Sequence, residues 1–139
     1  MKILLDTQAL LWALFERRKL SEAAREMLED PNHDKQISIV SAWEIAIKQG
    51  LGRLPYPADL RQVIDDCGFE YLALTSEHCH AYGSLPHDGM HRDPFDRMLV
   101  VQAMTEDAHL LSRDPALDRY GVNPHFPDEL VNRCPEMEI

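Results

Sequence analysis

The chain has few cysteines and no long apolar run. Its 139 residues include three cysteines, an odd number without paired spacing, which favours reduced thiols over a disulfide framework. No segment approaches the roughly 18 apolar residues of a membrane span. The apolar stretch 3–15 contains polar residues and is followed by charged ones, unlike a secretory signal. We therefore expect one domain in a cytoplasmic protein that does not enter the membrane.

Positive charge is also scarce. Lys and Arg together number 14 against 24 Asp and Glu, which gives a net charge of −10 and a pI near 5.0. A protein that binds nucleic acid through a general basic surface has the opposite balance. A polyphosphate substrate would need bound cations and a local basic strip. The acidity could equally serve solubility or attract a basic protein partner. The composition alone does not choose between a metal-bound polyphosphate substrate, solubility and a basic partner.

Several common catalytic motifs are absent. The chain has no G-x-S-x-G, no P-loop and no glycine pattern of a dinucleotide site. Its seven histidines are not accompanied by a Cys-x-x-Cys or His-Glu-x-x-His frame, which disfavours a zinc site.

Strand and helix signals alternate along the chain. Strands are predicted over residues 2–5, 36–40, 70–74 and 109–112, with a short fifth over 123–126. Helical patterns between them start near Thr7, Ser21, Ser41, Asp59, Thr75 and Asp93. This alternation predicts an α/β fold, with a parallel sheet of four to five strands between helices in a three-layer αβα sandwich. Residues 1–126 would form the domain and residues 127–139 a polar C-terminal tail.

The helices offer clear core candidates. Trp12 and Trp43 both fall on apolar helix faces, so we predict that both pack in the core. Leu10 in the first helix and Leu99 and Val101 in the last helix are further candidates.

Carboxylates recur at the ends of these elements. Asp6 and Asp114 lie just past predicted strands, Glu44 lies one helical turn beyond another, and Asp93 and Asp96 begin a helix. Right-handed crossovers place all strand carboxyl ends at one edge of a parallel sheet. In open α/β sheets the functional crevice lies outside that edge. The fold is therefore expected to gather these acids in one place.

Each acid also has a structural interpretation. Asp6 could simply end a strand or begin a helix, and Asp114 could be a turn residue before proline. Ser41-x-x-Glu44 has the pattern of a capping box. Asp93 precedes a proline and is the expected cap of its helix.

Taken together, the acids suit a divalent metal. Mg²⁺ and Mn²⁺ prefer hard oxygen ligands, usually a few carboxylates with water and substrate phosphate. Two such ions about 4 Å apart can activate water and stabilise the leaving oxygen of a phosphodiester. The pattern therefore indicates a metal-dependent hydrolase.

The ordered motifs carry a family resemblance. They are Leu4–Thr7, Ser41–Lys48, His91–Arg97, Leu99–Ala103, Leu110–Asp114 and Tyr120–Val122. Over about residues 1–122 the chain resembles the PIN domain, specifically the VapC-like ribonuclease toxins of type II toxin–antitoxin modules. The resemblance implies the αβα fold and endonucleolytic cleavage of RNA that depends on Mg²⁺ or Mn²⁺.

The resemblance also implies roles for single residues. Asp6, Glu44, Asp96 and Asp114 match the catalytic acids; Asp6, Asp96 and Asp114 would hold metal, and Glu44 would position or deprotonate the attacking water. Thr7 and Asp93 would support them. Among the basic residues near these motifs, Arg92, Arg97 and Arg113 are candidates for contacts with substrate phosphates.

Partners follow from the same resemblance. It implies a homodimer blocked by a cognate antitoxin, and contact with promoter DNA only through that antitoxin. The tail and the 86–90 loop depart from the family pattern. Two other functions stay open: a structure-specific DNA nuclease of the same fold, and a non-catalytic regulator that only binds an antitoxin.

Overall fold

The structure is a computed structural model that describes residues 1–56, 59–85 and 93–112. The predicted strand over 123–126, the predicted tail over 127–139 and the loop over 86–90 lie outside these residues. In the part that is described, no helix is long and apolar enough to cross a membrane.

A parallel sheet forms the centre of the described chain. Its four strands are β1 (Lys2–Leu5), β2 (Asp34–Ser38), β3 (Glu70–Leu72) and β4 (His109–Leu111), in the order β3-β2-β1-β4. In the middle of the sheet, Leu4 of β1 pairs with Gln36 on one side and with Leu110 on the other. The parallel arrangement predicted from the alternating pattern is confirmed.

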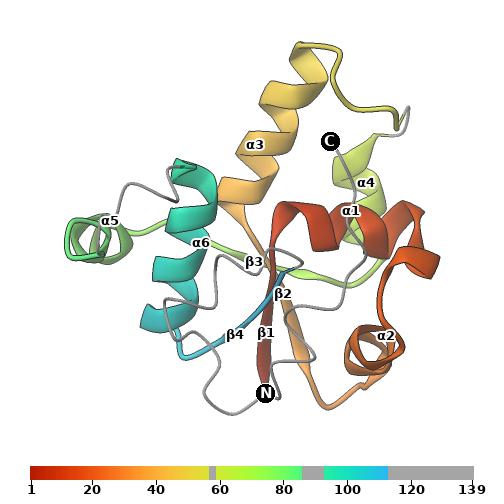
Figure 1. Cartoon of the computed structure of the whole chain (residues 1–139), viewed down its shortest axis with the longest axis horizontal. Coiled ribbons are helices and arrows are strands. Elements are labelled where there is room, and N and C mark those ends of the chain that lie inside the picture. Colours follow the sequence, from red (N-terminus) through yellow and green to blue (C-terminus); the bar gives the residue numbers. More distant parts are fainter. Residues whose placement is uncertain (57–58, 86–92, 113–139) are drawn as a thin grey trace.

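Helices cover both faces of this sheet. They are α1 (Thr7–Phe15), α2 (Glu22–Glu29), α3 (Ile39–Gly50), α4 (Leu60–Asp66), α5 (Ser76–Tyr82) and α6 (Pro94–Thr105), with a 3-10 turn over Arg17–Lys19. Figure 1 shows α1, α2 and α4 on one side of the sheet and α5 and α6 on the other, while α3 projects from the end of the strands. The predicted three-layer sandwich is therefore confirmed.

Strand alternation explains the two layers of core. Ile3 and Leu5 point into a cluster with α1, α2, α3 and α4, whereas Leu4 points into a second cluster with α6. All three side chains are fully buried. Strands covered on both faces need a continuous apolar run, which is what the start of the chain provides.

The helix starts differ from the prediction at two places. Asp6, not Thr7, caps α1, since its side chain accepts a hydrogen bond from the backbone N–H of Ala9. Helix α3 begins at Ile39, because Ser38, three residues before the predicted cap Ser41, ends β2 and accepts from the N–H of Val40. The predicted capping box at Ser41 is thus wrong: Ser41 already lies inside the helix.

Other predicted boundaries hold. Asp93 caps α6 by accepting from the N–H groups of Phe95 and Asp96, with Pro94 in the first turn. Gly52 and Gly68 follow α3 and α4 with φ of 67° and 76°. Glycine adopts this left-handed conformation without steric cost, which suits the end of a helix.

The two tryptophans have different environments. Trp12 is fully buried, as predicted, but Trp43 is 60% exposed, so its assignment to the core is wrong. Helix α3 projects from the body and buries only one side, which includes Val40 and Ile45. When a helix has apolar residues on more than one side, as α3 does, the helical period does not show which side packs against the protein.

A buried polar network joins three elements beneath the sheet edge. Ser38 Oγ donates to Gln102 Oε1 at 2.5 Å, and Gln102 Nε2 lies 3.3 Å from His78 Nδ1. His78 Nδ1 also accepts from the Thr75 N–H, and its Nε2 lies 2.9 Å from Glu106 Oε1. Ser38, His78 and Gln102 are fully buried. The network therefore fixes the start of α3 against α5 and α6.

We predict that Gln102→Leu lowers the free energy of unfolding by about 1–3 kcal/mol, because it leaves buried partners without a hydrogen bond. Urea denaturation measures the change. Gln49→Leu, the same substitution at an exposed position of α3, should stay within about 0.5 kcal/mol of the wild type. Equal losses in the two variants would show that the network contributes nothing specific.

Candidate active site at the carboxyl edge of the sheet

Asp6 lies where the strand order switches. It directly follows β1, between β2 on one side and β4 on the other. Its backbone N–H donates to the carbonyl of Leu111 at 3.0 Å. Its Oδ1 accepts from the N–H of Ala9 at 2.7 Å, and its Oδ2 accepts from Ser112 Oγ at 2.6 Å. The carboxylate, only 4% exposed, is therefore held at the position where open α/β sheets bind ligands.

Glu44 is tied to the residue that follows Asp6. Thr7 Oγ1 donates to Glu44 Oε1 at 2.5 Å and is hydrogen-bonded to Ser41 Oγ at 3.1 Å. Lys48 Nζ lies 3.2 Å from Glu44 Oε2, one helical turn along α3. Glu44 is 8% exposed, so its charge is offset by an ammonium group and a hydroxyl rather than by bulk water.

Asp96 reaches the same edge from α6. Only residues 106–108 separate α6 from β4, so α6 ends at the amino edge of the sheet and starts at the carboxyl edge. Phe95 packs edge-on against Trp43, with ring centroids 5.1 Å apart, and this contact joins the starts of α6 and α3. Asp96, half-buried, thus belongs to a third helix start at this edge.

Helix polarity helps the chain hold these charges. Asp6 is the N-cap of α1, and Asp96 lies in the first turn of α6. The positive end of the helix macrodipole and its unpaired N–H groups stabilise carboxylates there. Two of the predicted acids are consequently compatible with a folded chain even without metal.

Part of the predicted site lies outside the described residues. Asp114, Arg92 and Arg113 belong to this part. Within the described ranges, no group of three or more His, Cys, Asp or Glu side chains is placed to hold a metal ion. The donors that are described nevertheless suit Mg²⁺ or Mn²⁺, since the buried carboxylate of Asp6 supplies the hard oxygen atoms that these ions prefer.

Arg97 has an environment unlike that of a phosphate ligand. It is 1% exposed, its guanidinium lies 5.4 Å from the centroid of the Tyr82 ring, and one nitrogen donates to the carbonyl of Leu85. These contacts favour a packing role between α5 and α6 over the predicted contact with substrate. The helical period could have indicated that Arg97 is buried, because Arg97 lies on the same face of α6 as the buried Val100 and Val101.

Sequence reasoning missed Ser112. This fully buried residue directly follows β4 and holds Asp6 by the 2.6 Å hydrogen bond across the switch point. The available signal was its position: it is the last residue of the predicted strand over 109–112, at the carboxyl edge where Asp6 was expected.

A family model described as the PIN domain matches residues 3–123, most of the chain. The chain belongs to the PIN domain family. No match was found among curated proteins. The PIN assignment agrees with the resemblance expected from the motifs over residues 1–122.

Solved structures share the fold at low sequence identity. A chain of VapBC2 from Rickettsia felis, bound to a promoter DNA fragment, is 16% identical with a TM-score of 0.65, over 86% of this chain and 93% of that one. VapBC-1 from nontypeable Haemophilus influenzae is 19% identical with a TM-score of 0.64, over 92% and 98%. A toxin–antitoxin complex from Klebsiella pneumoniae is 17% identical with a TM-score of 0.56, over 90% and 92%.

We predict that Thr7→Val lowers the free energy of unfolding by about 2 kcal/mol, because the buried Glu44 carboxylate loses a hydrogen-bond donor. Thr7→Ser retains the hydroxyl and loses one methyl group, so its loss should be nearer 0.8 kcal/mol, a rough figure for one buried methylene. Chemical denaturation of both variants gives the comparison. A valine variant as stable as the serine variant would show that the bond is not stabilising.

Proposed function

We propose that this protein is a metal-dependent endoribonuclease, the toxin of a toxin–antitoxin module. The observation that carries the proposal is the pair of buried acids, Asp6 and Glu44, joined through Thr7 at the sheet edge of a PIN domain. Burying two carboxylates of one site is costly for stability alone. A catalytic use explains why the chain retains both.

Similar structures support the toxin–antitoxin assignment. Each of the three solved structures described above comes from a VapBC or toxin–antitoxin complex. In our proposal a cognate antitoxin binds this chain, promoter DNA is contacted only through that antitoxin, and the nuclease is a cytoplasmic homodimer. The net charge of −10 suits a partner that carries basic residues.

Divalent metal is part of the proposal. Asp6, Asp96 and Asp114 would hold Mg²⁺ or Mn²⁺, which when bound supplies an activated water and neutralises charge on the phosphate. Ser112 and Ala9 fix the orientation of the Asp6 carboxylate through their hydrogen bonds. Because its orientation is fixed, the Asp6 carboxylate can bind the metal ion without first being ordered by substrate.

Glu44 is the general base in this proposal. Thr7 and Lys48 hold its two oxygens, at 2.5 and 3.2 Å. A carboxylate held in this way is positioned to orient the attacking water and accept its proton. Asp93 acts indirectly, because it caps the helix that presents Asp96.

We predict that the purified chain cleaves single-stranded RNA in Mg²⁺ or Mn²⁺ and that EDTA stops the cleavage. Asp6→Asn and Asp96→Asn should abolish cleavage, and Glu44→Gln should slow it on the order of 100-fold or more. Asp34→Asn is the matched control, since Asp34 is exposed at the opposite edge of the sheet, at the start of β2. Denaturing gels of labelled oligonucleotides provide the measurement.

Other outcomes of this assay identify the alternatives. Cleavage of structured DNA with intact RNA would favour the DNA nuclease. Inertness toward both nucleic acids, in a folded chain that still binds an antitoxin, would favour the non-catalytic regulator.

We predict separately that Mg²⁺ or Mn²⁺ raises the melting temperature of the wild type. A ligand at 100 times its dissociation constant stabilises the folded state by about 2.7 kcal/mol. Asp6→Asn should weaken this response, because an amide is a poorer metal ligand than a carboxylate. The amide oxygen of the variant can still accept from the N–H of Ala9, and its NH2 group can donate to Ser112 Oγ, so the helix cap is retained. Thermal melts with metal or EDTA test this; an undiminished response in Asp6→Asn would remove Asp6 from the metal site.

A further inference from the structure

Trp43 is a large aromatic side chain held on the surface. It is 60% exposed, yet Phe95 packs against it at an interplanar angle of 62°. An edge-to-face contact restrains an indole while leaving much of its face accessible. Because the Trp43 indole is already restrained, it loses little conformational entropy when another ring stacks on it.

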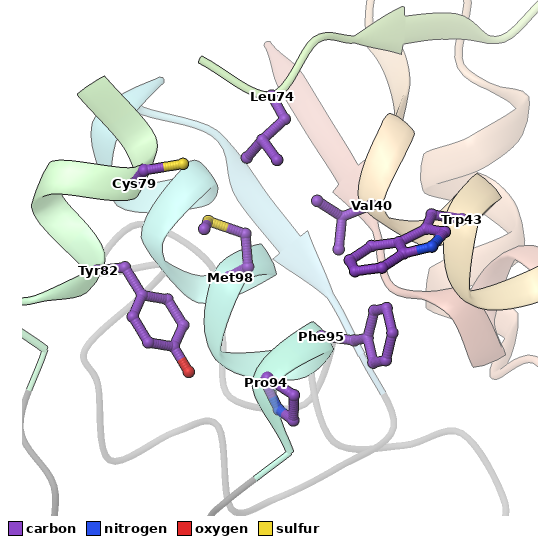
Figure 2. A pocket seen from close by; sticks show the side chains of 8 residues that line it. All are labelled: Val40, Trp43, Leu74, Cys79, Tyr82, Pro94, Phe95 and Met98. Atoms are coloured by element: carbon purple, nitrogen blue, oxygen red, sulfur yellow. The ribbon is translucent and has the colours of Figure 1, made fainter. Parts of the chain in front are cut away.

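An apolar groove continues from this aromatic pair. Its volume is about 380 Å³, which lies at the low end of the range typical of small-ligand sites. Figure 2 shows Trp43 and Phe95 on one side, Cys79 and Tyr82 on the other, and Met98 between them. The described residues that line the groove are all uncharged.

The groove adjoins the proposed catalytic acids. Trp43 precedes Glu44 on α3, and Phe95 precedes Asp96 on α6. Successive residues of a helix point about 100° apart. Glu44 therefore turns toward Thr7 while Trp43 turns toward Phe95, and the groove lies beside the acids rather than over them.

Helix α3 itself does not repel a polyanion, and the carboxylates nearest to Trp43 outside it are Asp93 and Asp96 at the start of α6. Helix α3 contains one acid, Glu44, which is buried and paired with Lys48. In a chain with a net charge of −10, this helix therefore presents no exposed carboxylate to a nucleic acid. A surface without a general basic patch needs another source of affinity, and stacking on aromatic rings supplies one.

We propose that Trp43, supported by Phe95, forms a base-stacking subsite that binds an unpaired nucleobase next to the scissile phosphodiester. This inference rests on the proposed ribonuclease function and adds a determinant of substrate choice. The indole stacks on the flat face of the base, and the groove shields the base edge from water. Because a base inside a duplex is already stacked on its neighbours, the subsite selects single-stranded RNA.

The steady-state test compares Trp43→Ala with the wild type on a single-stranded RNA oligonucleotide in Mg²⁺. Loss of one stacked base should lower kcat/KM roughly 5- to 100-fold, mainly through KM, and Trp43→Phe should recover part of it. Leu51→Ala is the matched control, since Leu51 is also 60% exposed but lies at the far end of α3. Equal kcat/KM in Trp43→Ala and the wild type overturns the subsite.

Abasic substrates locate the contact. In a set of oligonucleotides with one abasic nucleotide each, one position near the cleavage point should reduce cleavage by the wild type. On that oligonucleotide Trp43→Ala should cause no further loss. Additive losses at every position overturn the stacking contact.

Fluorescence separates this inference from the proposed nuclease activity. Trp12 is fully buried, so quenching by added single-stranded RNA reports on Trp43. Quenching without cleavage would support the subsite and reject the nuclease activity. Cleavage without quenching would support the nuclease activity and reject the subsite. If Trp43→Ala changes the oligomeric state by light scattering and leaves RNA binding intact, the surface is a protein contact and the subsite is rejected.

Discussion

The side chain of Asp6 holds the functional edge of this protein together. One carboxylate oxygen caps α1 and the other accepts from Ser112 behind β4, while the backbone N–H extends the pairing of β1 with β4. A single residue therefore joins two strands and a helix at the point where the strand order switches. The adjacent Thr7 carries this restraint to Glu44 and α3. The positions of Asp6 and Glu44 follow from that pair of neighbouring residues.

A second restraint acts from the other face of the sheet. The network from Ser38 through Gln102 to His78 fixes the start of α3 against α5 and α6. Helix α3 is thus held at its base by buried polar contacts, although much of it projects from the body. This explains how a helix with little buried surface can place Glu44 inward and Trp43 outward with a defined orientation. The catalytic and substrate-binding roles that we propose can then occupy different sides of one helix.

Much of the fold was predictable, and the reasons are local. The apolar run Lys2–Leu5 and the alternation of strand and helix patterns are sufficient for a parallel sheet covered on both faces. Asp93 before Pro94 is a strong local signal for a helix start, and it holds. The start of α3 was misplaced because two serines, Ser38 and Ser41, are equally good caps by sequence. The choice depends on Gln102, which lies far along the chain but next to Ser38 in space.

Periodicity and capping chemistry depend on a few neighbouring residues, so the amino-acid sequence alone predicts the parallel α/β architecture and which acids lie at element ends. The environment of each side chain depends instead on tertiary packing. This packing buried Arg97, exposed Trp43 and brought Ser112 to Asp6. Burial and long-range hydrogen bonds depend on which elements pack together, and the strand order β3-β2-β1-β4 that sets this packing is not encoded in any single segment.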